Sequence, residues 1–177
     1  MPLFRPRARP LSRRAFLLTG LLLPAATALG GCGFRLRGPQ RMEFATLHVG
    51  VPAQTELGAQ LRRLVATSDS TIVVEDPAEA EARLQILANA RGREILSLTG
   101  AGKVREYQLN QSLRFQLLDK AGKTLIPPTT LSARRDYNFD EDAVLGKAQE
   151  EEMLYRDMQD DLVQQLMRRL SAYRRSG

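Results

Sequence analysis

The sequence is poor in the side chains on which most catalysis and metal binding depend. Its 177 residues include one histidine, one cysteine and no tryptophan. This composition excludes a His/Cys metal cluster, and any Cys–His or Ser–His pair that does not use His48. His48 lies between Leu47 and Val49 with its side chain on the other face, as expected of an ordinary strand histidine. These absences leave few arrangements for catalysis, and we expect no metal or other cofactor.

Acidic residues are absent from residues 1–31, which contain five arginines and an apolar stretch over 15–29. A basic segment, a short apolar segment and small residues before a cleavage point predict a secretory signal peptide. The apolar stretch is shorter than the ~20 residues of a spanning helix, which disfavours the alternative of a transmembrane anchor.

A pair of arginines, Arg13 and Arg14, lies inside this segment in the order Ser-Arg-Arg-Ala-Phe-Leu. This context resembles a twin-arginine export signal, which would allow the protein to fold before it crosses the membrane. The alternative is an ordinary secretory signal that contains an accidental arginine pair.

The single cysteine, Cys32, directly follows Leu29-Gly30-Gly31, which looks like a lipobox. We expect cleavage between Gly31 and Cys32, and a covalent diacylglycerol lipid on the thiol of Cys32. Two or more acyl chains give a stable membrane anchor. By resemblance to lipoprotein sorting rules, Gly33 rather than aspartate after the cysteine favours the outer membrane. The alternative, a buried free cysteine, does not account for its place after the signal.

The excess of positive charge belongs mainly to the signal segment. The whole chain has 26 basic and 20 acidic residues, and removal of residues 1–31 leaves 21 basic and 20 acidic residues. The high isoelectric point is therefore no argument for binding nucleic acid. Within the remainder, residues 91–135 carry a net charge of +6 and residues 136–177 a net charge of −4. This asymmetry indicates either an anionic partner near the middle segment or differently solvated faces.

Two glycine-rich stretches predict turns rather than phosphate-binding loops. Ala121-Gly122-Lys123-Thr124 lacks the earlier glycine of such a loop, and Gly100-Ala101-Gly102-Lys103 lies between two extended segments. Glycine at a hairpin turn supplies a positive φ without strain.

The remaining patterns predict an α+β domain over residues 42–177, joined to the lipid by a tether over 32–41. We expect strands over 45–51, 82–98 with a bulge beside Gly92, 105–119, and 130–139 after Pro127-Pro128. Residues 71–74 form either a short strand or an extended stretch. We expect one helix after the N-cap Thr55 and a second from Asp140 onward, each with an apolar stripe. The odd residues from 107 to 117 are mostly apolar and the even ones polar, which indicates a strand with one exposed face.

The predicted order is β-α-β-β-β-α. Two helices should pack on one face of a roughly four-stranded, mostly antiparallel or mixed sheet. The other face, rich in glutamine, asparagine, serine and arginine, is suited to docking against a polar wall. The alternative is a plain solvated face.

The segment Gly-Cys-Gly-Phe-Arg-Leu-Arg-Gly over 31–38 and the segment Arg-Glu-Tyr-Gln-Leu over 105–109 resemble the LptE family of outer-membrane lipoproteins. The resemblance implies a plug inside the outer-membrane β-barrel LptD, where the pair inserts lipopolysaccharide into the outer leaflet. It implies no bond-making chemistry, and lipopolysaccharide as a direct ligand. Two other functions stay open: a lipid-anchored hydrolase, and an accessory subunit of another envelope transport machine.

Lipopolysaccharide carries phosphates and carboxylates, so its contacts should be cationic. We expect an anion-binding patch at one end of the sheet, unless each cation is simply solvated. The candidate residues are Lys103, Arg105, Arg134 and Arg135.

Overall fold

The computed structural model describes residues 41–68 and 70–174. The predicted signal peptide and almost all of the tether lie outside these residues, and so do Arg13, Arg14, Gly31 and Cys32. The buried core lies within residues 42–170.

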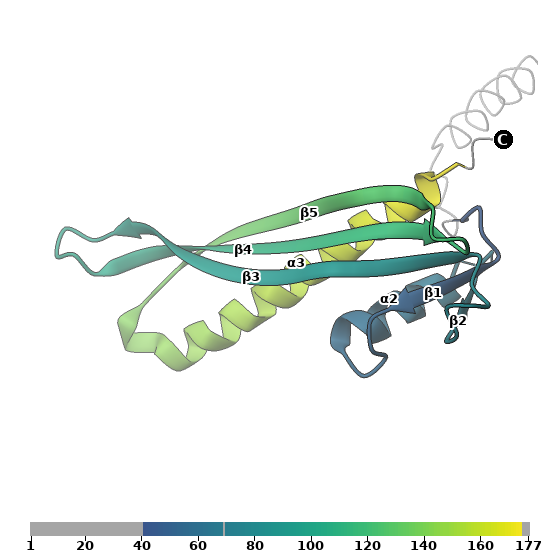
Figure 1. Ribbon diagram of the computed structural model, residues 1–177. Coiled ribbons are helices and arrows are strands. Elements are labelled where there is room, and N and C mark those ends of the chain that lie inside the picture. Colours follow the sequence, from purple (N-terminus) through teal and green to yellow (C-terminus); the bar gives the residue numbers. More distant parts are fainter. Residues whose placement is uncertain (1–40, 69, 175–177) are drawn as a thin grey trace, which may run out of the picture. The chain divides into compact units, whose positions relative to one another are not determined.

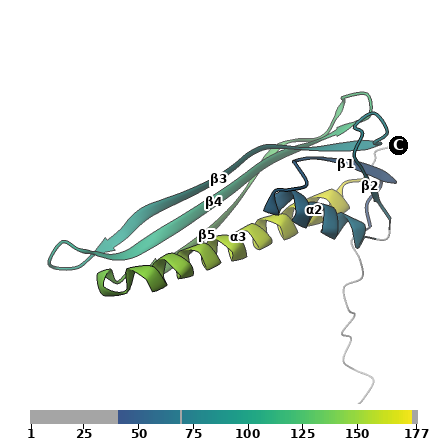
Figure 2. The ribbon, with the colours of Figure 1, turned by 90° about the horizontal axis from the view of Figure 1, so that it is seen from below.

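The described part is a five-stranded mixed sheet with two helices on one face, which confirms the predicted α+β class (Figures 1 and 2). The strands are β1 (Thr46–Gly50), β2 (Ile72–Val74), β3 (Ala82–Leu98), β4 (Val104–Asp119) and β5 (Thr124–Asn138), in the order β2-β1-β3-β4-β5. The helices are α2 (Glu56–Ala66) and α3 (Val144–Ala172), and a 3-10 turn, η1 (Glu141–Ala143), precedes α3. The short β2 makes the sheet one strand wider than the predicted four. It pairs parallel to β1, as does β3 on the other side.

Helix α2 begins where the sequence predicts. The hydroxyl of Thr55 accepts a hydrogen bond from the N–H of Gly58 at 3.0 Å and so caps the helix. Its apolar stripe buries Leu57, Leu61 and Val65. In α3, the predicted stripe is buried from Met158 through Leu162 and Leu166 to Leu170. Both helices therefore cover the same face of the sheet with their apolar sides.

Strand β4 follows the predicted alternation, with Leu109, Leu113, Phe115 and Leu117 buried. Both of its hairpin turns contain a glycine with positive φ, Gly102 at 76° and Gly122 at 88°, as predicted.

The predicted bulge beside Gly92 is wrong. Gly92 pairs regularly with Asn110, and the register of β3 shifts instead at Leu87 and again after Ile95. The extra residue at Leu87 turns Ala88 and Ala90 away from the helices, although the sequence placed them with Leu84 and Ile86. The helix-facing positions beyond it include Arg91 and Arg93, which are charged, so the phase change did not show in the apolar pattern until Ile95.

Strand β5 begins at Thr124, earlier than the predicted 130, and includes Pro127 and Pro128. β5 is an edge strand of the sheet, with no neighbouring strand on its outer side. Proline has no backbone N–H to donate, and on that side no strand needs such a donor. A shift of register between Phe115 and Leu117 of β4 accommodates these prolines.

Candidate functional site

The open face of the sheet, opposite the helices, contains a polar hollow across β3, β4 and β5. Three rows of paired residues form it, in register from strand to strand. The rows are Ala90–Ser112–Ser132, Gly92–Asn110–Arg134 and Glu94–Gln108–Asp136. Because side chains alternate across a strand, all nine positions face the same side.

The hollow exists because small residues lie in its floor. Ala90, Gly92, Ser112 and Ser132 leave space between the longer side chains at its border. The cavity has a volume of about 550 Å³ and is open to solvent. A Cβ atom built on Gly92 would meet no other atom within 4 Å, so the backbone of β3 lies open there. The hollow is large enough for one or two sugar-sized groups.

The border of the hollow offers both donors and acceptors of hydrogen bonds. It carries the guanidinium of Arg134, the carboxylate of Glu94 and the amides of Gln108 and Asn110. The Gln108 side-chain amide donates to the Asp136 carboxylate at 3.0 Å, which holds that border in place. Within residues 41–68 and 70–174, Arg134 forms no ion pair, so its five N–H donors are available to an anion.

The four predicted cations do not form one patch in this structure. Arg134 and Arg135 are neighbours in β5 and therefore point to opposite faces of the sheet. Arg135 faces α3 and pairs with Asp161. Lys103 and Arg105 lie near the β3–β4 turn, and Arg105 is four positions, or about 13 Å, along β4 from the residue that pairs with Arg135.

Lys103 and Arg105 already have anionic partners. The Lys103 ammonium lies 2.6 Å from a carboxylate oxygen of Glu141, and this hydrogen bond raises the pKa of Lys103. Arg105 lies 3.4 Å from the Glu106 carboxylate. A hydrogen bond from the Ser97 hydroxyl, and then the charge of Arg105, lower the pKa of Glu106. Of the four candidates, Arg134 is the one whose side chain lines the hollow and has no such partner among the described residues.

A network of arginines and tyrosines supports the floor of the hollow from the helix side. Arg93 pairs with Glu151 of α3 at 2.8 Å, and its guanidinium lies 4.4 Å from the ring centre of Tyr107. The Tyr155 hydroxyl donates to the carbonyl of Gly92 at 2.8 Å, so α3 holds the backbone directly beneath the cavity. The Tyr137 hydroxyl donates to Glu151 at 2.6 Å. Burial, and then this hydrogen bond, raise the pKa of Tyr137 to about 12.

The sequence analysis missed this network because it counted Arg91 and Arg93 only as part of a basic segment. Arg91 lies 5.0 Å from the ring centre of Tyr155 and pairs with Glu152 at 3.3 Å. Both arginines thus bind α3 instead of a ligand. The signal that could have revealed them is the acidic run over 150–152, which faces them from α3.

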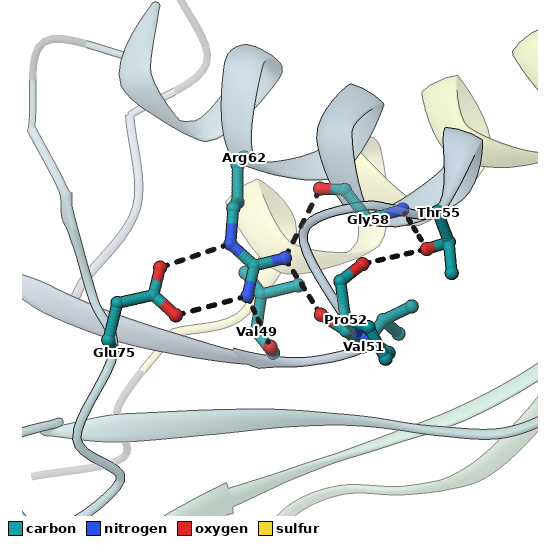
Figure 3. A network of polar contacts seen from close by, with 7 residues as sticks. All are labelled: Val49, Val51, Pro52, Thr55, Gly58, Arg62 and Glu75. Atoms are coloured by element: carbon teal, nitrogen blue, oxygen red, sulfur yellow. Dashed lines mark hydrogen bonds and ion pairs between the residues drawn. The ribbon is translucent and has the colours of Figure 1, made fainter.

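Arg62 is a second basic side chain that serves the fold (Figure 3). Its guanidinium donates to the carbonyls of Val51 at 2.8 Å and Val49 at 3.2 Å, and it pairs with Glu75 at 3.3 Å. A further donor reaches the carbonyl of Gly58 at 3.4 Å. These contacts occupy its guanidinium, so we do not count Arg62 as a candidate anion-binding residue.

In the described part of the chain, no group of three or more His, Cys, Asp or Glu side chains is placed to hold a metal ion. Among the same residues, no helix is both long and apolar enough to span a membrane. His48 lies within β1, as predicted.

A mixed sheet with two helices on one face and a hollow on its open polar face defines an α+β domain with two layers. A family model described as "LptE: Lipopolysaccharide-assembly" matches residues 44–170. The chain therefore belongs to the LptE family.

Relatives and solved structures agree with this assignment. The chain is 28% identical over 158 residues to the LPS-assembly lipoprotein LptE of Pectobacterium atrosepticum, which covers 87% of this chain and 84% of that protein. It is 30% identical over 163 residues to that of Yersinia enterocolitica, covering 89% of this chain and 75% of that protein. The solution structure of an uncharacterized lipoprotein B from Nitrosomonas europaea superposes with a TM-score of 0.67 at 37% identity. That match covers 80% of this chain and 92% of that one.

Proposed function

We propose that this chain is a lipoprotein of lipopolysaccharide assembly at the outer membrane, and that it acts as the plug and assembly partner of an LptD-like β-barrel. The match to the LptE family and the names of its relatives support the role in assembly. The protein binds and positions its partners and makes or breaks no bond in them.

The observation that carries direct contact with lipopolysaccharide is the polar hollow on the open face. Its border combines an unpaired guanidinium with amides and a carboxylate, and lipopolysaccharide presents phosphates, carboxylates and hydroxyl groups. Arginine binds phosphate and carboxylate through paired hydrogen bonds. Arg134 is thus the principal contact. Lys103, Arg105 and Arg135 contribute only if the ligand displaces their present partners.

The test of this contact is lipopolysaccharide binding by purified protein carrying Arg134→Glu. A charge-assisted hydrogen bond contributes about 1.5–3 kcal/mol, so we expect affinity to fall roughly tenfold or more. The matched control is Arg156→Glu, which reverses an exposed arginine on α3 that has no ion pair within the described residues. Wild-type affinity in Arg134→Glu would refute the contact.

The partner is tested by purification from detergent-solubilised outer membrane. We expect an LptD-like barrel to co-purify with the chain, and depletion of the chain to reduce lipopolysaccharide at the cell surface. If a different envelope transporter co-purifies, the chain is an accessory subunit of that machine. If no barrel co-purifies and surface lipopolysaccharide is unaltered on depletion, the proposal is wrong.

The anchor is tested at Cys32. We expect mass spectrometry of the mature protein to find an acylated N-terminal cysteine, and Cys32→Ser to release the protein from the membrane fraction. Replacement of Arg13 and Arg14 by lysine should block export only if the twin-arginine route is used.

A further inference from the structure

The place where the chain enters the domain lies at one end of the sheet, which we call the entry end. Glu43, two residues after the first described residue, pairs with Arg174 beyond the end of α3 at 2.7 Å. The β4–β5 turn lies at the same end, because Asp119 pairs with Ala82, and Ala82 pairs with Leu47 near the start of β1. Figure 1 shows these segments together at the right.

Exposed cations gather at the entry end from three separate parts of the chain. They are Arg41, Lys120, Lys123, Arg168 and Arg169. Among residues 41–68 and 70–174, none of these five forms an ion pair.

The acidic side chains nearby are mostly engaged. Glu43 pairs with Arg174, the Glu81 carboxylate accepts from the N–H of Ala45 at 3.0 Å, and the Asp119 carboxylate accepts from the N–H of Lys123 at 2.8 Å. Glu79 is exposed and its carboxylate has no hydrogen bond within the described part. A hydrogen bond from a backbone N–H leaves a carboxylate its charge, so these four carboxylates offset four of the six cations at the entry end, Arg174 included. The entry end therefore carries a net positive charge of about two.

The opposite end of the sheet differs. There Arg91, Arg93 and Lys103 each pair with a glutamate of η1 or α3. Five of the cations that form no ion pair among the described residues therefore lie where the chain enters, and this group favours an anionic partner at that end.

The short segment between Cys32 and the domain favours a membrane surface as this anionic partner. Only nine peptide steps separate Cys32 from Arg41. At no more than ~3.6 Å per step, this segment spans at most about 32 Å. An acylated Cys32 would therefore keep the entry end near the membrane surface.

We propose that the entry end binds the surface of a membrane that contains anionic phospholipids, with its lysines and arginines against the headgroup phosphates. This inference rests on the lipid anchor of the proposed function. Two acyl chains already anchor a protein stably, so the basic patch acts by orienting the domain, and each lysine or arginine near an anionic surface adds about 1 kcal/mol of attraction. The contact holds the long strands at a fixed angle to the membrane and keeps the hollow on the open face away from the bilayer that anchors the chain.

The test uses the chain from residue 33 onward, which lacks the acyl chains but keeps the whole described core over 42–170. It is mixed with vesicles of pure phosphatidylcholine, and with vesicles in which about a third of the lipid is phosphatidylglycerol, and the bound fraction is measured by flotation. We expect binding to the anionic vesicles alone, lost as salt is raised. Each basic residue near an anionic surface strengthens binding roughly fivefold, so Lys120→Glu with Lys123→Glu should weaken it at least ~25-fold.

A matched control keeps the net charge change the same. Lys147→Glu with Arg156→Glu reverses two cations of α3 remote from the entry end and should leave vesicle binding within about twofold of wild type. Arg168→Gln with Arg169→Gln provides a second variant, in α3, that should weaken binding. Absence of binding to anionic vesicles, equal binding to both vesicle types, or equal losses in the test and control variants would overturn the proposal. None of these outcomes involves lipopolysaccharide or a barrel, so the proposed function is tested separately.

Discussion

At the scale of single residues, guanidinium groups fulfil three different roles in this protein. Arg62 donates to backbone carbonyls of the fold, Arg93 joins the sheet to α3, and Arg134 lies on the open face with no ion pair in the described part of the chain. Their partners decide these roles, since the residue type is the same in each case. A basic residue in this sequence is therefore a candidate ligand only after its contacts are known.

Arg62 donates hydrogen bonds to backbone carbonyls that lie beyond the reach of β2. β2 covers β1 only as far as His48, and Arg62 donates to the carbonyls of Val49 and Val51 beyond it. We expect Arg62→Ala to lower the free energy of unfolding by about 2–3 kcal/mol, because half-buried acceptors lose a charged donor. Urea denaturation measures the change. The neighbouring exposed Arg63→Ala should stay within about 0.5 kcal/mol of wild type, and equal losses in both variants would contradict this role.

Tyr137 should make the stability of the folded protein fall at alkaline pH. Its pKa of about 12 in the folded protein exceeds the ordinary tyrosine pKa of about 10. The folded state therefore favours the neutral hydroxyl. This contribution is complete below pH 10 and is lost as the pH rises through about 12. Between these values the wild-type protein should lose more stability than Tyr137→Phe, as measured by urea unfolding at each pH. Parallel losses in the two proteins would show that Tyr137 is not responsible.

At the scale of elements, a glycine-to-alanine substitution should have opposite effects on stability in the two helices. Gly58 lies in the first turn of α2, where an added Cβ would come within 2.1 Å of the carbonyl oxygen of Pro52. Gly146 lies in α3 with no atom within 4 Å of such a Cβ. We expect Gly58→Ala to destabilise the protein by about 1–3 kcal/mol and Gly146→Ala to stabilise it by about 0.5–1 kcal/mol. Chemical denaturation of both variants checks the signs, and a stabilising Gly58→Ala would contradict the described approach of α2 to β1.

The elements that the sequence predicted best are those with one fully buried face. The alternation along β4 and the stripe of α3 were readable because each apolar side chain faces the same core. The bulge of β3 was misplaced because Arg91 and Arg93 occupy helix-facing positions through contacts with α3 that no local pattern reveals. The start of β5 was missed because an edge strand tolerates two prolines.

The candidate site was predictable only in outline. The composition of the open face pointed to polar docking, but the hollow requires Gly92, Ser112 and Ser132 to lie side by side. That placement depends on the register of three strands, which is fixed by the bulge at Leu87 and by long-range pairing. The same pairing separates Arg134 from Arg135, which are adjacent in sequence.

At the scale of the whole molecule, the domain has three distinct surfaces. The apolar face of the sheet is covered by α2 and α3 (Figure 2). The opposite face is open and polar, and the entry end is cationic. In the proposed arrangement the entry end meets the membrane surface and the open face meets lipopolysaccharide. The two contacts use different residues and can be abolished separately.

The most direct test of the central claim is photo-crosslinking of the full-length protein in cells, with the reactive side chain placed at one position at a time. Asn110 and Ser132 report on the hollow of the open face, and Gln164 reports on the exposed side of α3. The account predicts adducts with lipopolysaccharide at Asn110 and Ser132 and none at Gln164. Adducts with lipopolysaccharide at Gln164, and none at the two positions in the hollow, would contradict it.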